Sequence, residues 1–173
     1  MNEVISNIIN RRSIRSYKPD MVPQDIIDQV ITAGTYAATC TNTQSPIIIS
    51  ITNREVRDQL SAINAEVMGG KGDPFYGAPV VLAVLADKKY PQHVYDGSVV
   101  IANMMLAAHS LNIGSCWIHR AKETFERPEG QQILKSLGIE GDYEGIGYCV
   151  LGYTDGEYPK TPARKENWVY TID

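Results

Sequence analysis

The sequence predicts a single domain, residues 1–173, of the α+β class, in which helices cover both faces of a central mixed sheet. Helical and strand-like patterns alternate along the chain. Runs at 47–52 and 78–86 are apolar enough to be buried strands, and 95–111 is apolar around most of a helix. Two helical patterns precede the first strand, so a simple doubly wound order does not follow.

Periodicity and turn residues place each element in order. The expected helices are 3–10, one within 22–38, 54–68, 95–111 and one around 130–137. The expected strands are 47–52, 78–86, 115–118 and 145–153. Polar or glycine-rich loops are expected at 39–46 and 69–74, and an extended apolar tail at 168–172.

Particular residues set the boundaries of these elements. Pro23 suits the first turn of a helix, and Asp25 lies near the positive end of that helix dipole. Pro46 closes the polar loop before the first strand. Gly114 and Gly138 end two helical patterns, as glycine does at helix C-termini.

Composition excludes several classes of protein. A net charge of -4 argues against a general nucleic-acid binder, which needs a basic face to neutralise phosphates. The first ten residues lack the basic region of a secretion signal, and the apolar run at 78–86 is too short to span a membrane. Cys40, Cys116 and Cys149 have neither CxxC nor metal-ligand spacing. We therefore expect a cytoplasmic protein with reduced thiols, no metal and no membrane partner.

The arginine segment, residues 10–17 with the sequence NRRSIRSY, concentrates positive charge in an acidic chain. Clustered arginines most often form a solvated surface. If the segment is extended, however, Arg11, Ser13 and Arg15 share one face and Ile14 anchors the other. Two guanidinium groups flanking a hydroxyl match the oxygens of a phosphate. The spacing therefore leaves both a surface patch and an anion site open.

Other polar clusters allow similar pairs of interpretations. Arg164 and Lys165 form a second cationic pair that could converge on the same anion. The loop 39–46 suits either a turn held by its own side chains or a polar lip over a ligand. Trp117 is more typical of a core, and His119 has no catalytic partner in sequence. No GxGxxG, P-loop, HExxH or GxSxG motif is present.

Five blocks together resemble the nitroreductase family of FMN-dependent NAD(P)H oxidoreductases. They are INRRSIRSY, the stretch from VPQDIIDQV to TNTQSPIII, FYGAPVVLAVLAD, NMMLAAHSLNIGSCWI, and GIGYCVLGY with the tail TPARK. The resemblance covers nearly the whole chain, and its specificity comes from the order of the blocks. It implies a nitroreductase-like fold and an intertwined homodimer with two FMN sites at its interface.

The resemblance also implies roles for individual residues. The positions that match FMN phosphate, ribityl and ring contacts are Arg11, Arg12, Ser13 and Arg15. Arg164 and Lys165 match a second phosphate-binding cluster. A loop that reaches the flavin from the partner subunit matches Thr39, Cys40, Asn42 and Gln44. The segment along the flavin, where a backbone N–H faces N5, matches Trp117, Ile118, His119 and Arg120.

The implied activity is a ping-pong transfer of hydride from NAD(P)H through FMN to a small acceptor such as a nitroaromatic or a quinone. The flavin carries the chemistry, so no side-chain catalytic residue is expected. The chain has Ala38-Thr39 and Gln44-Ser45-Pro46 where the family usually has Pro-Ser and Gln-Pro, and it lacks the extra central helices of many relatives. Alternatives are a dehydrogenase, dehalogenase or flavin-fragmenting enzyme of this fold, a non-catalytic flavin-binding protein, or a nucleic-acid-binding module.

Overall fold

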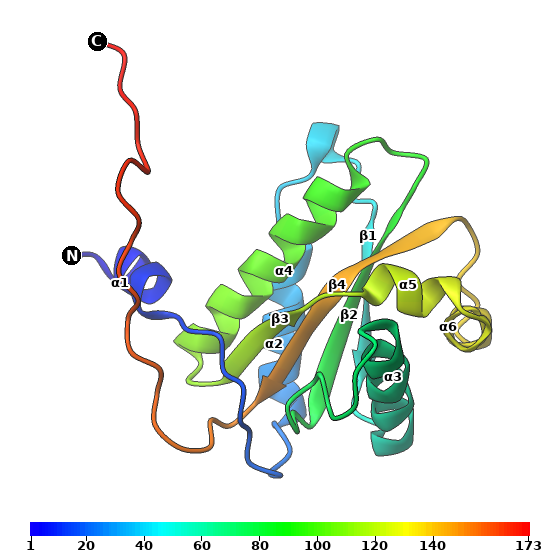
Figure 1. Ribbon diagram of the computed structural model, residues 1–173. Coiled ribbons are helices and arrows are strands. Elements are labelled where there is room, and N and C mark those ends of the chain that lie inside the picture. The colour runs from blue at the N-terminus through cyan, green and yellow to red at the C-terminus, as the bar shows by residue number, and fades with distance from the viewer.

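The computed structural model describes residues 1–173, whose helices lie around a four-stranded sheet (Figure 1). The helices are α1 (Glu3–Asn10), α2 (Gln24–Thr35), the short 3₁₀ helix η1 (Cys40–Asn42), α3 (Arg54–Val67), α4 (His93–Ser110), α5 (Ala121–Glu126) and α6 (Pro128–Ser136). The strands are β1 (Pro46–Ile51), β2 (Val80–Asp87), β3 (Gly114–Ile118) and β4 (Tyr143–Gly152). None of the helices combines the length and apolar character that a membrane crossing requires.

The sheet has the order β1-β2-β4-β3, and all three strand pairings are antiparallel. The parallel component expected of a mixed sheet is therefore absent from the four strands. It survives only as an isolated parallel bridge between Ser13 and Ser115, where the arginine segment runs beside β3. The α+β class and the cover of helices on both faces are confirmed.

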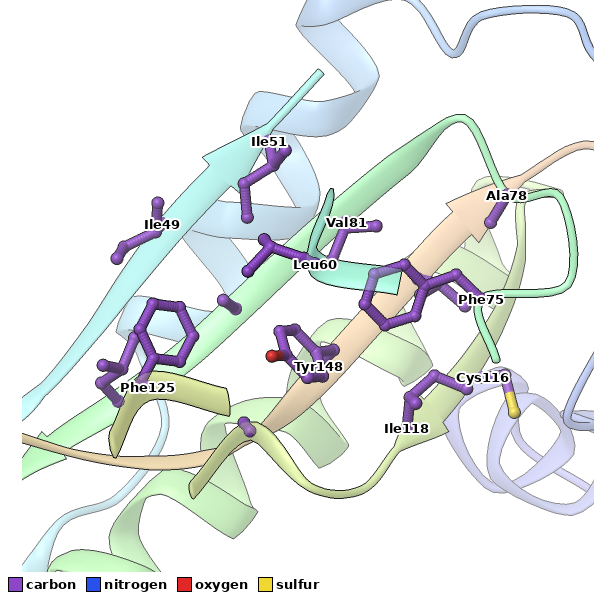
Figure 2. Packing of buried hydrophobic residues seen from close by; sticks show 14 of the residues in the cluster. Ile49, Ile51, Leu60, Phe75, Ala78, Val81, Cys116, Ile118, Phe125 and Tyr148 are labelled. Atoms are coloured by element: carbon purple, nitrogen blue, oxygen red, sulfur yellow. The ribbon is translucent and has the colours of Figure 1, made fainter. Parts of the chain in front are cut away.

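Two apolar clusters lie on opposite faces of the sheet. Helices α3, α5 and α6 contribute to the first cluster, and α2 and α4 to the second. Alternate residues of β2 enter the two clusters, so this strand is buried on both faces, as its unbroken apolar run predicts. Figure 2 shows Tyr148 of β4 in the first cluster, and its ring centroid lies 5.1 Å from that of Phe75.

The sequence prediction misses α5, and it places α1 correctly. Helix α5 has only six residues, and its N-cap Arg120 makes no side-chain capping bond, so it carries neither a periodic pattern nor a start signal. Helix α1 forms over the predicted residues, but none of its residues is buried. Its aliphatic side chains are half-exposed, and the apolar tail from Trp168 to Ile172 is exposed as well. Both are apolar surfaces without a cover inside the chain.

Candidate functional site

The arginine segment is extended and lies against the edge strand β3. The Ile14 N–H donates to the Ser115 carbonyl at 2.9 Å, and the Ile14 side chain is 2% exposed within the core. Burying Ile14 directs Arg11, Ser13 and Arg15 to the opposite face, as alternation predicts. Arg12, which strict alternation would place on the side of Ile14, lies with these three residues instead.

A pocket of about 320 Å³ forms over this face. Its lining consists mainly of basic residues and prolines from the two ends of the chain: Arg11, Arg12, Ser13, Arg15, Pro159, Lys160, Pro162 and Arg164. Two of its guanidinium nitrogens, Nη1 of Arg11 and Nε of Arg12, are buried and have no hydrogen-bond partner. Buried charged donors without an acceptor are costly, so the pocket is built to receive an anion.

The basic side chains at the pocket differ in how many hydrogen bonds they make within the chain. Arg12 donates to the carbonyls of Ile9 and Arg11, each at 2.7 Å, and to the Thr161 hydroxyl, so it braces the chain. Arg15 has an exposed guanidinium that makes no hydrogen bond or ion pair within the chain. Lys165 lies outside the pocket lining, and its Nζ sits over the Trp168 ring at 5.0 Å from the centroid. Lys160 occupies the lining instead.

Tyr158 fixes the C-terminal tail over the arginine segment. Its hydroxyl accepts the Arg12 N–H at 3.0 Å and donates to the Asn10 carbonyl at 3.1 Å. Its ring stacks on His109 at the end of α4, with centroids 6.0 Å apart. Sequence reasoning missed Tyr158, Thr161 and Lys160, because no periodic pattern connects an irregular tail to residues some 150 positions earlier.

The positive charges of this site affect the pKa of His109. Burial lowers its pKa, and the nearby positive charges of Arg11 and Arg12 lower it further. The folded protein thus binds fewer protons than the unfolded chain at pH values just below the ordinary histidine value of 6.5, so stability falls as the pH falls through that region.

We therefore expect His109→Gln to flatten the pH dependence of stability. The wild-type chain should lose more unfolding free energy than H109Q between pH 7 and pH 5, because only the wild type must keep a neutral imidazole beside two arginines. Denaturant titrations at several pH values measure this difference. Parallel curves for the two proteins would show that His109 carries no part of the acid sensitivity.

The polar loop 39–44 is held at the opposite end of α4. The buried carboxylate of Asp96, in the first turn of α4, accepts the Cys40 N–H at 3.0 Å and the Thr43 hydroxyl at 3.4 Å. The Thr39 hydroxyl accepts the Gln44 N–H at 3.1 Å, and the Gln44 side chain donates to Asn42. Positive φ angles at Thr41, Asn42 and Gln44 make the loop a tight turn. A carboxylate at the start of an otherwise apolar helix was the available signal for Asp96.

This loop and the arginine segment do not meet within one chain. Asp96 and His109 lie near the two ends of α4, thirteen positions apart, which corresponds to about 20 Å along the helix axis. Figure 1 shows the same separation, with η1 beyond one end of α4 and the arginine segment near the other.

The segment from Trp117 to Arg120 consists of the last two residues of β3 and the two residues that connect it to α5. Trp117 is 46% exposed, and its indole covers Gly147 so closely that a Cβ there would lie 2.1 Å from Nε1. Ile118 is buried in the core. His119 is exposed, and its carbonyl accepts the Asn64 side chain at 2.7 Å. The His119 imidazole makes no hydrogen bond within the chain.

The cysteines take no part in a disulfide. Cys40 is exposed, whereas Cys116 and Cys149 are buried, and all three are free thiols. Burial raises the pKa of the Cys116 thiol, more than the neighbouring Arg15 and Arg11 lower it. The thiol beside the arginine segment is thus held in its protonated, unreactive form.

Comparisons with known proteins give the chain a family. The model of the nitroreductase family matches residues 8–71 and 64–153. Two relatives are both named "Putative NADH dehydrogenase/NAD(P)H nitroreductase". One, from Methanothermobacter thermautotrophicus, is 31% identical over 66% of this chain and 60% of its own length. The other, from Archaeoglobus fulgidus, is 29% identical over 91% of this chain and 88% of its own length.

A solved structure agrees with the sequence matches. It is a nitroreductase with bound FMN from Bacteroides fragilis, which superposes with a TM-score of 0.89 at 27% identity over the full length of both chains. The family model alone covers most of the chain, from the arginine segment to the end of β4. This chain belongs to the nitroreductase family.

Proposed function

We propose that the chain is an FMN-dependent NAD(P)H oxidoreductase that holds the phosphate of FMN in the basic pocket. The observation that carries the proposal is the pair of buried guanidinium nitrogens without partners, on Arg11 and Arg12, at a pocket lined by four arginines. An FMN phosphate supplies the missing acceptors, and arginine matches phosphate oxygens with paired hydrogen bonds. The bound FMN of the Bacteroides fragilis nitroreductase supports the same ligand.

The residues divide into phosphate-binding and ring-binding groups. Arg11, Ser13, Arg15 and Arg164 bind the phosphate. Arg12 offers it Nε, while its two Nη atoms brace the segment through three bonds within the chain. The segment from Trp117 to Arg120 contains the last two residues of β3 and leads away from this pocket into α5, so we assign it to the flavin ring.

The functional unit in this proposal is a homodimer. The loop bearing Thr39, Cys40, Asn42 and Gln44 lies about 20 Å along α4 from the basic pocket, so it would reach FMN only from a second copy of the chain. The uncovered apolar side chains of α1 and of the tail give such a copy surfaces to bury. Both observations favour an obligate assembly over a monomer.

Bound FMN would supply the redox chemistry, which is the transfer of a hydride equivalent from NAD(P)H through N5 to a small acceptor such as a nitroaromatic or a quinone. Donor and acceptor would use the same open face in turn. The protein orients the ring, excludes water from one side and places positive charge near the developing negative charge, and arginine is suited to this task. No proton-transferring side chain is needed, which agrees with the lone His119.

The visible absorption spectrum tests the proposal. Protein purified with added FMN is expected to be yellow, to bleach on anaerobic addition of NADH or NADPH, and to recover colour when a quinone or nitroaromatic is added. Light scattering should give twice the chain mass of 19.2 kDa. A colourless protein that takes up no FMN would refute the proposal. A yellow protein that neither NADH nor NADPH bleaches would refute the oxidoreductase activity and show that the chain only binds flavin.

A further inference from the structure

The junction between β3 and α5 is held by one buried side chain of α3. Asn64 is fully buried, and its amide acts on both sides. Its Nδ2 donates to the His119 carbonyl at 2.7 Å, and its Oδ1 accepts from Nε of Arg120 at 3.0 Å. An amide can do this because its donor and its acceptor are on two separate atoms.

The backbone at this junction needs such a support. Arg120 has φ 72° and ψ 20°, in the left-handed region that residues with a Cβ seldom occupy. Conformations of this kind persist where the surroundings fix them, and they cluster at functional sites. Gly145 of β4 supports the junction from another side, because its missing side chain lets the backbone of Ala121 pack directly against the strand.

Holding the His119 carbonyl also fixes the direction of a backbone donor. The carbonyl of His119 and the N–H of Arg120 belong to the same peptide group, which is trans, so they point in opposite directions. Because Asn64 draws the carbonyl toward α3, the Arg120 N–H is directed away from α3. Neither this N–H nor that of His119 is donated to another group of the chain. The junction thus presents an oriented, unused donor.

We propose that Asn64 is a positioning residue, which aligns the Arg120 N–H toward N5 of FMN by holding the peptide group between His119 and Arg120. The inference rests on the proposed function, in which this segment follows the flavin ring. A donor aimed at N5 can bond to oxidised flavin but opposes the N–H that N5 carries after reduction. The alignment therefore favours oxidised FMN and lowers the midpoint potential.

Two variants separate the contributions of the amide. Asn64→Asp keeps an acceptor for Arg120 and loses the donor to the His119 carbonyl, whereas Asn64→Leu loses both. The matched control is Asn53→Ala on the same helix, because the Asn53 side chain caps α3 by accepting the Val56 N–H at 3.1 Å. The control weakens α3 at its far end and leaves the junction untouched.

The measurements are the FMN dissociation constant, the two-electron midpoint potential of bound FMN and the thermal unfolding of the apoprotein. For both Asn64 variants we expect the preference for oxidised FMN to fall about tenfold, a rise of about 30 mV in potential. The phosphate pocket should keep FMN binding within a few-fold of wild type. The control should share the loss of thermal stability but keep the wild-type potential.

The outcomes distinguish this inference from the proposed function. If the wild-type chain binds no FMN, both the proposed function and the positioning role of Asn64 are overturned. If it binds FMN and reacts with NAD(P)H while the Asn64 variants keep the wild-type potential or shift it downward, only the positioning role is overturned. The same holds if the control shifts the potential as much as N64D, since the effect would then follow from loss of stability alone.

Discussion

Arg15→Ala is expected to weaken FMN binding by about 10- to 150-fold, which corresponds to the roughly 1.5–3 kcal/mol of a hydrogen bond to a charged group. Arg15 lines the basic pocket, and its guanidinium makes no contact that the fold needs. Truncation should thus remove a phosphate contact with little loss of stability. Arg12 differs, because its side chain bonds to Ile9, Arg11 and Thr161.

Quenching of FMN fluorescence measures the affinity, and Lys18→Ala is the matched control. Lys18 follows in the same extended segment and is exposed, but it does not line the pocket. Its loss removes an equal charge and should change the affinity only through weak, salt-screened attraction. Equal effects of the two substitutions would mean that general charge, rather than a phosphate contact of Arg15, governs binding.

Gly145→Ala is expected to destabilise the fold by about 3 kcal/mol, the upper part of the range for overpacked cores. A Cβ at this position would lie 2.4 Å from both the carbonyl carbon and the oxygen of Ala121. These are backbone atoms at the start of α5, and they cannot rotate away. Gly145 also pairs with Leu85 at the irregularity in the β2–β4 register, so β4 has little freedom to retreat.

Thermal unfolding measures this effect, which should appear as a fall in Tm of about 6–12 °C for a chain of this size. Gly70→Ala serves as the control, because a Cβ there would meet only the flexible end of Met68 at 3.2 Å. An unchanged Tm for G145A would mean that α5 can move away from β4 at little cost. The β3–α5 junction held by Asn64 would then be able to shift more easily than its contacts indicate.

The elements with strong patterns could be predicted from the sequence, and those defined by a single contact could not. The unbroken apolar run of β2 and the helices α3 and α4 appear within about two residues of their expected positions. Helix α5 was missed because tertiary packing against Gly145, rather than a local signal, places it. The antiparallel direction of all strands was not predictable, since apolar runs do not encode direction.

The candidate site divides in the same way. Alternation along the arginine segment predicts its anion-facing side, because the rule depends only on neighbouring residues. The polar partners that hold the site are distant in sequence: Tyr158 on Arg12, Asp96 on the loop, and Asn64 on the β3–α5 junction. Each is one side chain among many of its type, so its role depends on the fold and leaves no local pattern.

The length of α4 has a genetic consequence. Suppose that each site combines the arginine segment of one chain with the loop of another. Mutations in the two parts, when they are carried by different chains, need not then add up in their effect on activity. A chain disabled at Arg15 and a chain disabled in the loop at Asn42 could pair to give one site with both parts intact and one with neither. Two inactive alleles would then complement each other in the same cell, whereas two alleles damaged in the same part would not.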